Sequence, residues 1–178
     1  YYLAFSFAPR AETNILNYLW PLLTVVFGMV ADRRLFRWRS VFGALLGFLG
    51  AVLVIAGGEG LRVESGCVLG YGLAVGAALV WSSYSVLLGK RRLEPLSSNL
   101  AFNAVTCILA GLVVALTGVF RFPALRETIG LAMVGVVPIA GGFLFWQAGL
   151  NRGDPTLLGN LSFAIPLLSS LFLHVLAG

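Results

Sequence analysis

The stretch NYLWPLLTVVFG, Asn17–Gly28, decides the fold, because it is apolar enough for a membrane helix yet contains a proline. A proline inside a helix removes one backbone hydrogen bond and clashes with the preceding turn, at a cost of about 3 kcal/mol. A second stretch, LSFAIPLLSSLF, Leu161–Phe172, has the same layout around its own proline. The two stretches predict kinked membrane helices at Pro21 and Pro166.

The composition of the chain excludes a water-soluble domain. Of its 178 residues, 59% are hydrophobic and 11% are charged, whereas a soluble domain carries about 25% charged residues. The net charge of +5 comes from short basic clusters between apolar runs, which membrane topology explains better than nucleic-acid binding. Cys67 and Cys107 lie within apolar runs, so we expect small hydrophobic residues there, not a disulfide or a metal site.

Six apolar stretches are long enough to span a bilayer, which takes about 20 helical residues. None of them contains Asp, Glu, Lys or Arg, and they are too long and too uniformly apolar for barrel strands. The expected spans are Ile15–Ala31, Val41–Gly57, Gly66–Leu88, Leu100–Val119, Ile129–Leu150 and Pro155–Ala177. Tyr1–Ala8 has the character of the end of another helix. We therefore expect an all-α membrane protein, and the chain to be a fragment of a longer one.

The loops between these spans predict the orientation of the chain. One alternate set of loops, ADRRLFRWRS, GKRRLEP and NRGDPT, holds eight Lys or Arg residues, and the other set holds four. Cytoplasmic loops carry an excess of basic residues. The first set is therefore expected on the cytoplasmic side.

The 22 glycines of the chain include several with helix-contact spacing. Small residues four positions apart let helix backbones approach closely in lipid. The pairs are Gly43 and Gly47, Gly66 and Gly70, and Gly72 and Gly76. This spacing predicts a compact bundle, with a hinge or sliding surface as the alternative.

The two proline stretches form an internal repeat. At an offset of 145 residues, Tyr18 aligns with Phe163 and Asn17 with Ser162. The second copy lies in the fifth span after the first, so the copies cross the membrane in opposite directions. Inverted repeats of this kind build secondary transporters around a site near the midplane. We expect the kinks to lie beside a cavity; the alternative is that a neighbouring helix covers each defect.

Longer segments around these motifs resemble a known family. AETNILNYLWPLLTVVFG with GALLGFLGAVLVIAGG resembles the end of an EamA repeat of the drug/metabolite transporter superfamily. GYGLAVGAALVWSSYSVLLGKR resembles the start of the next repeat, and FLFWQAGLNRGDPTLLGNLSFAIPLLSSLF its later part. NYLWP is most similar to YddG-type exporters of aromatic amino acids. The resemblance implies a ten-helix transporter with inverted repeats, in which residues 1–60 end the first repeat (helices 3–5) and 61–178 form most of the second (helices 6–9).

The resemblance also directs attention to aromatic residues on the helices that would line a central cavity. WSSYS places Trp81, Tyr84 and Ser85 on one helical face, which offers rings and hydroxyl groups to an aromatic ligand. The alternative is an interfacial anchor, because LLGKRR follows closely. Tyr2, near the start of the chain, is a further candidate for the cavity wall.

Polar side chains within the apolar runs are the remaining candidates. Gln147, beside Trp146, needs a hydrogen-bond partner in hydrocarbon, either on another helix or in the cavity. Asn17 and Asn160 pose the same choice and are expected near helix starts, where capping is the alternative role. The single histidine, His174, is expected to be peripheral or hydrogen-bonded and not a pH sensor.

These features predict a secondary transporter of the bacterial inner membrane that exports small organic metabolites, aromatic amino acids among them, by alternating access. The alternative is a multi-span scaffold or receptor-like protein that transports nothing. We expect no enzyme, cofactor or metal, because hydrolase, phosphate-binding and zinc motifs are missing from the sequence. The expected partners are a small-molecule substrate and the lipid bilayer, without nucleic acid; a monomer is compatible with the sequence.

Overall fold

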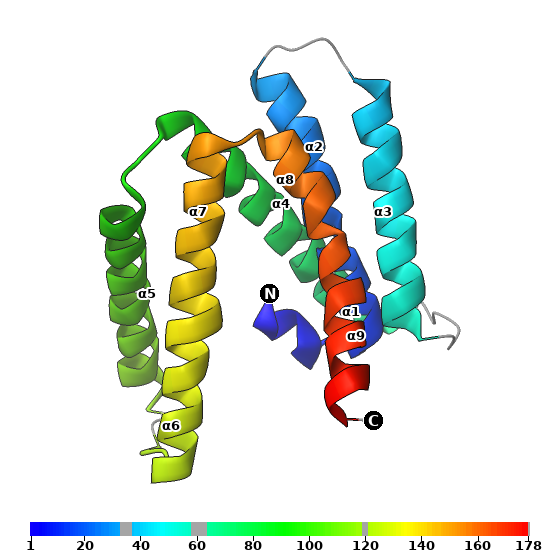
Figure 1. Cartoon of the computed structure of the whole chain (residues 1–178). Coiled ribbons are helices and arrows are strands. Elements are labelled where there is room, and N and C mark those ends of the chain that lie inside the picture. The colour runs from blue at the N-terminus through cyan, green and yellow to red at the C-terminus, as the bar shows by residue number, and fades with distance from the viewer. Residues whose placement is uncertain (33–36, 58–63, 119–120, 178) are drawn as a thin grey trace. The chain divides into compact units, whose positions relative to one another are not determined.

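The computed structural model describes residues 1–32, 37–57, 64–118 and 121–177, and every regular element within these ranges is helical (Figure 1). The elements are η1 (Tyr2–Ser6), α1 (Arg10–Asn17), α2 (Leu19–Ala31), α3 (Trp38–Ala56), η2 (Ser65–Cys67), α4 (Val68–Arg91), α5 (Pro95–Thr117), α6 (Leu125–Val134), η3 (Gly135–Gly141), α7 (Gly142–Arg152), α8 (Pro155–Ser162) and α9 (Ala164–Ala177).

Six helical stretches in the described ranges are long and apolar enough to cross a membrane, which confirms the number and order of the predicted spans. They are Arg10–Ala31, Trp38–Ala56, Ser65–Arg91, Pro95–Thr117, Leu125–Arg152 and Pro155–Leu176. Several begin earlier than predicted, because polar residues such as Glu12 and Ser97 continue the helix beyond its apolar run.

Local signals in the sequence set the ends of several helices. Pro95 and Pro155 open α5 and α8, where the missing N–H of proline costs nothing. The preceding Glu94 accepts hydrogen bonds from the backbone N–H groups of the first turn of α5, and hydrogen bonds from Ser97 and then Leu96 hold the pKa of Glu94 below its ordinary value. Gly118 ends α5 with a φ of +65°, a conformation that glycine adopts without strain.

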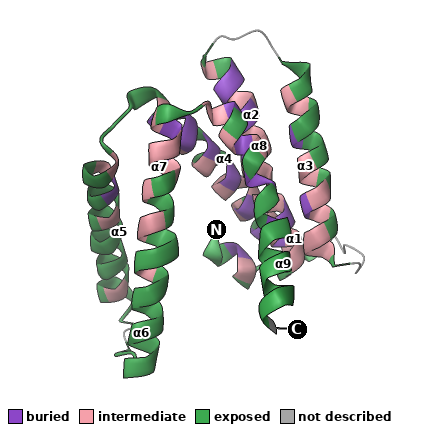
Figure 2. Ribbon diagram, in the orientation of Figure 1, coloured by how far each residue is buried: buried purple, intermediate pink, exposed green. Residues whose placement is uncertain are grey.

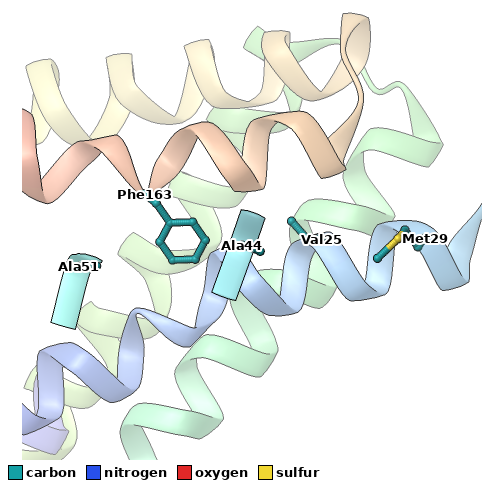
Figure 3. Packing of buried hydrophobic residues seen from close by; sticks show 5 residues of the cluster. All are labelled: Val25, Met29, Ala44, Ala51 and Phe163. Atoms are coloured by element: carbon teal, nitrogen blue, oxygen red, sulfur yellow. The ribbon is translucent and has the colours of Figure 1, made fainter. Parts of the chain in front are cut away.

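The helices form two compact units, and the first contains Tyr1–Lys90 together with Gly153–Gly178. In this unit α2 packs against α3 and α8, and α3 also packs against α9. Its apolar core consists of Val25, Met29, Ala44, Ala51 and Phe163 (Figure 3). Residues far apart in the sequence therefore meet in one core, which joins the helices of both proline stretches.

Glycine lets α3 approach the end of α8 closely. A methyl group added at Gly47 would lie 2.7 Å from ring carbons of Phe163, and one at Gly43 would lie 3.4 Å from Asn160 Oδ1. In contrast, added methyl groups at Gly72 and Gly76 would meet no atom within 4 Å. The glycine spacing thus marks a close helix contact on α3, but not within this part of α4.

The second unit, Arg91–Arg152, contains α5, α6, η3 and α7. The stretch Leu125–Arg152 is one span whose middle, η3, is a π-helix around Pro138. Because Pro138 has no N–H to donate, the wider turn accommodates it without ending the helix. Sequence analysis did not single out this third proline.

The surface of both units is largely apolar, as expected for a chain in lipid. Figure 2 shows that buried residues gather on α2, α4 and α8, whereas α5 and α6 are almost entirely exposed. The exposed side chains of α5 include Leu100, Ile108 and Leu116. Such a surface would be unstable in water but suits a hydrocarbon solvent.

Candidate substrate site

Both proline helices are interrupted at equivalent positions. The span Arg10–Ala31 breaks at Tyr18, between α1 and α2, and the span Pro155–Leu176 breaks at Phe163, between α8 and α9. Each break lies three residues before the proline, next to the carbonyl that the proline cannot reach with a hydrogen bond. Tyr18 and Phe163 are the residues that align in the internal repeat.

The two interrupted helices run in opposite directions and touch through their backbones. A methyl group added at Gly28 would lie 3.4 Å from Thr156 Oγ1, and one at Gly159 would lie 2.9 Å from the carbonyl oxygen of Pro21. The end of α2 therefore meets the start of α8, and the start of α2 meets the middle of α8. This is the antiparallel pairing of an inverted repeat.

An aromatic group lies between α2 and α4 and consists of Trp20, Trp81 and Tyr84. The ring centroids of Trp20 and Trp81 are 6.2 Å apart and the ring planes are nearly perpendicular, at 88°. The Trp81 and Tyr84 rings lie 5.5 Å apart at 34°. All three side chains are half-buried, so part of each ring is accessible. Edge-to-face contacts of this kind hold aromatic rings in defined orientations.

Hydroxyl groups connect the helices beneath this aromatic group. Ser82 Oγ lies 2.8 Å from the carbonyl oxygen of Trp20 and donates to it across the contact between α4 and α2. Thr24 Oγ1 donates to the same oxygen from within α2, at 2.8 Å. Ser82, Thr24 and Ser85 are fully buried. Ser85 is thus part of the packed interior beside the aromatic group.

A second set of aromatic rings lies at the start of the chain. Tyr1 packs against Tyr2 at 5.6 Å and against Phe5 at 4.9 Å, and the Tyr1 hydroxyl donates to Asn14 Oδ1. Tyr2 itself is 81% exposed. Of this set, the side chain predicted for the cavity is therefore the most accessible.

Gln147 is buried within the second unit and hydrogen-bonded to another helix. Its Nε2 donates to Ser98 Oγ of α5, and the Leu93 carbonyl is a second acceptor at 3.5 Å. Asn151 Nδ2 donates to the same carbonyl at 2.7 Å. Of the two alternatives for the Gln147 amide, the structure shows the bond to a neighbouring helix. Trp146, beside it, is half-buried.

The two asparagines do not lie near helix starts, which corrects that expectation. Asn17 is the last residue of α1, because the helix already begins at Arg10 with residues too polar for the apolar count. Asn160 lies within α8 and donates from Nδ2 to the Thr156 carbonyl at 2.9 Å. Neither side chain is therefore placed for N-terminal capping. His174 is exposed on α9.

Sequence analysis missed Trp20 and Ser82. Trp20 was visible beside Pro21, but nothing in a sequence says that its ring faces α4. Ser82 donates to a backbone carbonyl, which any residue could supply, so the partner has no sequence signal. Within the described ranges, no cluster of three or more His, Cys, Asp or Glu residues could hold a metal ion.

Comparison with known proteins places the chain among transporters. Residues 68–178 match the EamA-like transporter family. A curated relative from Ancylobacter novellus, named aromatic amino acid exporter YddG, is 37% identical over 98% of this chain and 61% of its own length. The exporter of the same name from Escherichia coli is 26% identical, over 93% and 58%. A solved structure titled "Crystal structure of protein" superposes with a TM-score of 0.90 at 34% identity, over 98% of this chain and 62% of the other.

The fold and the paired breaks define a multi-pass protein of the bacterial inner membrane built on inverted repeats. The chain belongs to the EamA-like transporter family. It spans about 60% of the length of the curated relatives described above.

Proposed function

We propose that this chain is part of a secondary transporter that exports small organic metabolites, aromatic amino acids in particular. Transport proceeds by alternating access between two inverted repeats, to which residues 1–60 and 61–178 contribute. No chemical bond changes during the cycle. The observation that carries the proposal is the antiparallel pair of broken helices, α1–α2 and α8–α9, with an accessible aromatic group beside it.

Aromatic amino acids fit the chemistry of this group. Trp81 and Tyr84 offer ring faces against which an aromatic side chain packs, and a ring contact contributes about 0.5–1.5 kcal/mol beyond its buried area. The names of the relatives from Ancylobacter novellus and Escherichia coli support the same substrate class. The further candidates for substrate contact are Trp146, Gln147, Asn17, Tyr2 and Ser85.

The prolines serve the conformational cycle in this proposal. A broken membrane helix leaves backbone carbonyls free to find new partners as the helices move. Pro21 and Pro166 each fix such a break at the same point of the repeat. A pair of equivalent breaks lets the two repeats exchange conformations between the outward-open and inward-open states.

The test is transport by the complete protein in proteoliposomes, with a panel of amino acids, nucleosides and cationic drugs. We expect saturable movement of aromatic amino acids and a weaker or absent response to the others. The absence of transport for the whole panel would overturn the proposal and favour a scaffold.

Substitution of the tryptophans tests the site separately. Trp81→Ala is expected to reduce transport of L-phenylalanine about tenfold, because the loss of one ring contact is worth about 1.4 kcal/mol. Trp146→Ala tests the second candidate ring in the same assay. Trp38→Ala is the matched control, since Trp38 is 75% exposed at the start of α3. Wild-type transport by Trp81→Ala would reject the assignment of Trp81.

A further inference from the structure

Ser82 lies on α4 between carbonyl groups of two different helices. Its Oγ is 2.8 Å from the Trp20 carbonyl oxygen on α2 and 2.6 Å from the Ala78 carbonyl oxygen on its own helix. A hydroxyl has one hydrogen, so the two oxygens share it or take it in turn. The residue is fully buried, so water does not replace either acceptor.

The same two helices also meet through Trp20 and Trp81. Trp20 accepts the Ser82 hydrogen bond with its carbonyl and contacts the Trp81 ring with its own ring, at 6.2 Å. Trp81 and Ser82 are neighbours in the chain. One residue pair on α4 therefore holds one residue on α2 at two points, and this fixes the rotation of α4 about its axis as well as its distance from α2.

Both groups in this hydrogen bond keep a partner when it opens. Ser82 retains the Ala78 carbonyl one turn earlier, a common partner of a helical serine. The Trp20 carbonyl retains the hydroxyl of Thr24. Opening the link thus leaves no unsatisfied polar group in the hydrocarbon, which would cost several kcal/mol. The link is suited to a site that changes shape in each cycle.

We propose that Ser82 is a positioning residue for substrate recognition: its releasable hydrogen bond to the Trp20 carbonyl holds the Trp20 and Trp81 rings in their edge-to-face arrangement. The proposal rests on the proposed function, because it concerns the same aromatic group. Ser82 touches no substrate and acts through the two rings.

The first test compares Ser82→Ala with wild type in proteoliposomes that transport L-phenylalanine. Hydrogen bonds between membrane helices are modest, so KM is expected to rise about three- to tenfold while kcat and the melting temperature change little. A raised KM with unchanged kcat indicates lost binding, not lost folding. Ser83→Ala is the matched control, because Ser83 is the exposed neighbour on the same helix.

The second test follows the rings without transport. In a protein with every tryptophan except Trp20 and Trp81 replaced by phenylalanine, the near-ultraviolet circular dichroism reports the mutual orientation of the two rings. Ser82→Ala is expected to change this spectrum, and Ser83→Ala to leave it unchanged.

An unchanged KM together with an unchanged spectrum for Ser82→Ala would overturn the proposal. A fall in kcat and melting temperature at constant KM would also overturn it, since that pattern indicates packing alone. If Ser82→Ala does not fold, Ser82→Cys decides by the same readouts, because its thiol keeps the volume but donates weakly. A wild-type protein that does not transport L-phenylalanine counts against the proposed function, while the spectra still decide the role of Ser82.

Discussion

Gly159 of α8 lies against the backbone of Pro21 of α2, so closely that an added methyl group would be 2.9 Å from the Pro21 carbonyl oxygen. The same methyl would be 3.0 Å from Val25 Cγ2. The two halves of the inverted repeat therefore meet through backbone atoms, with no side chain between them. This contact leads to the first prediction.

Gly159→Ala is expected to destabilise the protein by about 1–2 kcal/mol, although alanine is the better helix former. The reason is that a backbone carbonyl cannot move aside as a flexible side chain can. The measurement is the apparent melting temperature of the complete protein in detergent. Gly50→Ala is the control, because an added methyl at Gly50 meets no atom within 4 Å. Equal melting temperatures for the two variants would contradict the prediction.

The hydrogen bond between Gln147 and Ser98 is expected to couple α7 to α5 measurably. A double-mutant cycle with Gln147→Leu and Ser98→Ala should give a coupling energy of about 0.6 kcal/mol, and at most about 1.7 kcal/mol. The measurement is the free energy of unfolding in mixed micelles. As a control, Gln147→Leu is paired with Ser83→Ala, which lies outside this unit. Additive effects of Gln147→Leu and Ser98→Ala would show that the bond contributes nothing.

Replacement of the prolines is expected to separate folding from transport. Pro21→Ala and Pro166→Ala each restore a backbone N–H, so the breaks at Tyr18 and Phe163 should close and the helices should become more regular. We expect a melting temperature equal to or above that of wild type and transport slower by about tenfold. Pro138→Ala is the comparison, since its helix is widened and not broken. Wild-type transport rates in both variants would sever the link between the breaks and the cycle.

Protection of the start of α5 is expected to depend on pH through Glu94. Hydrogen bonds from Ser97 and Leu96 hold the pKa of this carboxyl below its ordinary value, so the ionised form stabilises the folded helix end. That stabilisation is complete above the pKa of the unfolded chain and is lost as the pH falls through the folded value. Hydrogen exchange of the Leu96 and Ser97 amides should therefore become faster under acid conditions, after correction for intrinsic rates.

Glu94→Gln provides the control for this experiment. Its amide oxygen still accepts hydrogen bonds but does not titrate, so the extra acceleration in acid should disappear. If the wild type and Glu94→Gln respond to pH in the same way, the carboxylate is not the source of the effect.

Composition and periodicity were sufficient for the membrane spans, because the bilayer imposes length and polarity on every crossing helix. The repeat was also visible, since Pro21 and Pro166 leave the same mark in two apolar runs. The opposite direction of the two copies follows from counting the spans between them. These features depend on residue identity and order alone.

The contacts at the candidate site could not be predicted in the same way. Ser82 donates to the backbone of Trp20, and Gln147 found one of two partners that the sequence left open. Asn17 was expected near a helix start because the polar residues from Arg10 onward did not look like part of a span. The choice in each case depends on how helices are rotated against one another, which no local pattern specifies.

The wide turn at Gly135–Gly141 has a consequence for insertions and deletions. A π turn holds one residue more than the α turns on either side, so it absorbs that residue without rotating the helix beyond it. Loss of one residue inside this segment would leave Gln147 in phase with Ser98, whereas loss of one between Gly142 and Trp146 would swing the amide around the axis by about 100°. The length of this helix is adjustable at one place only, and the proline marks it.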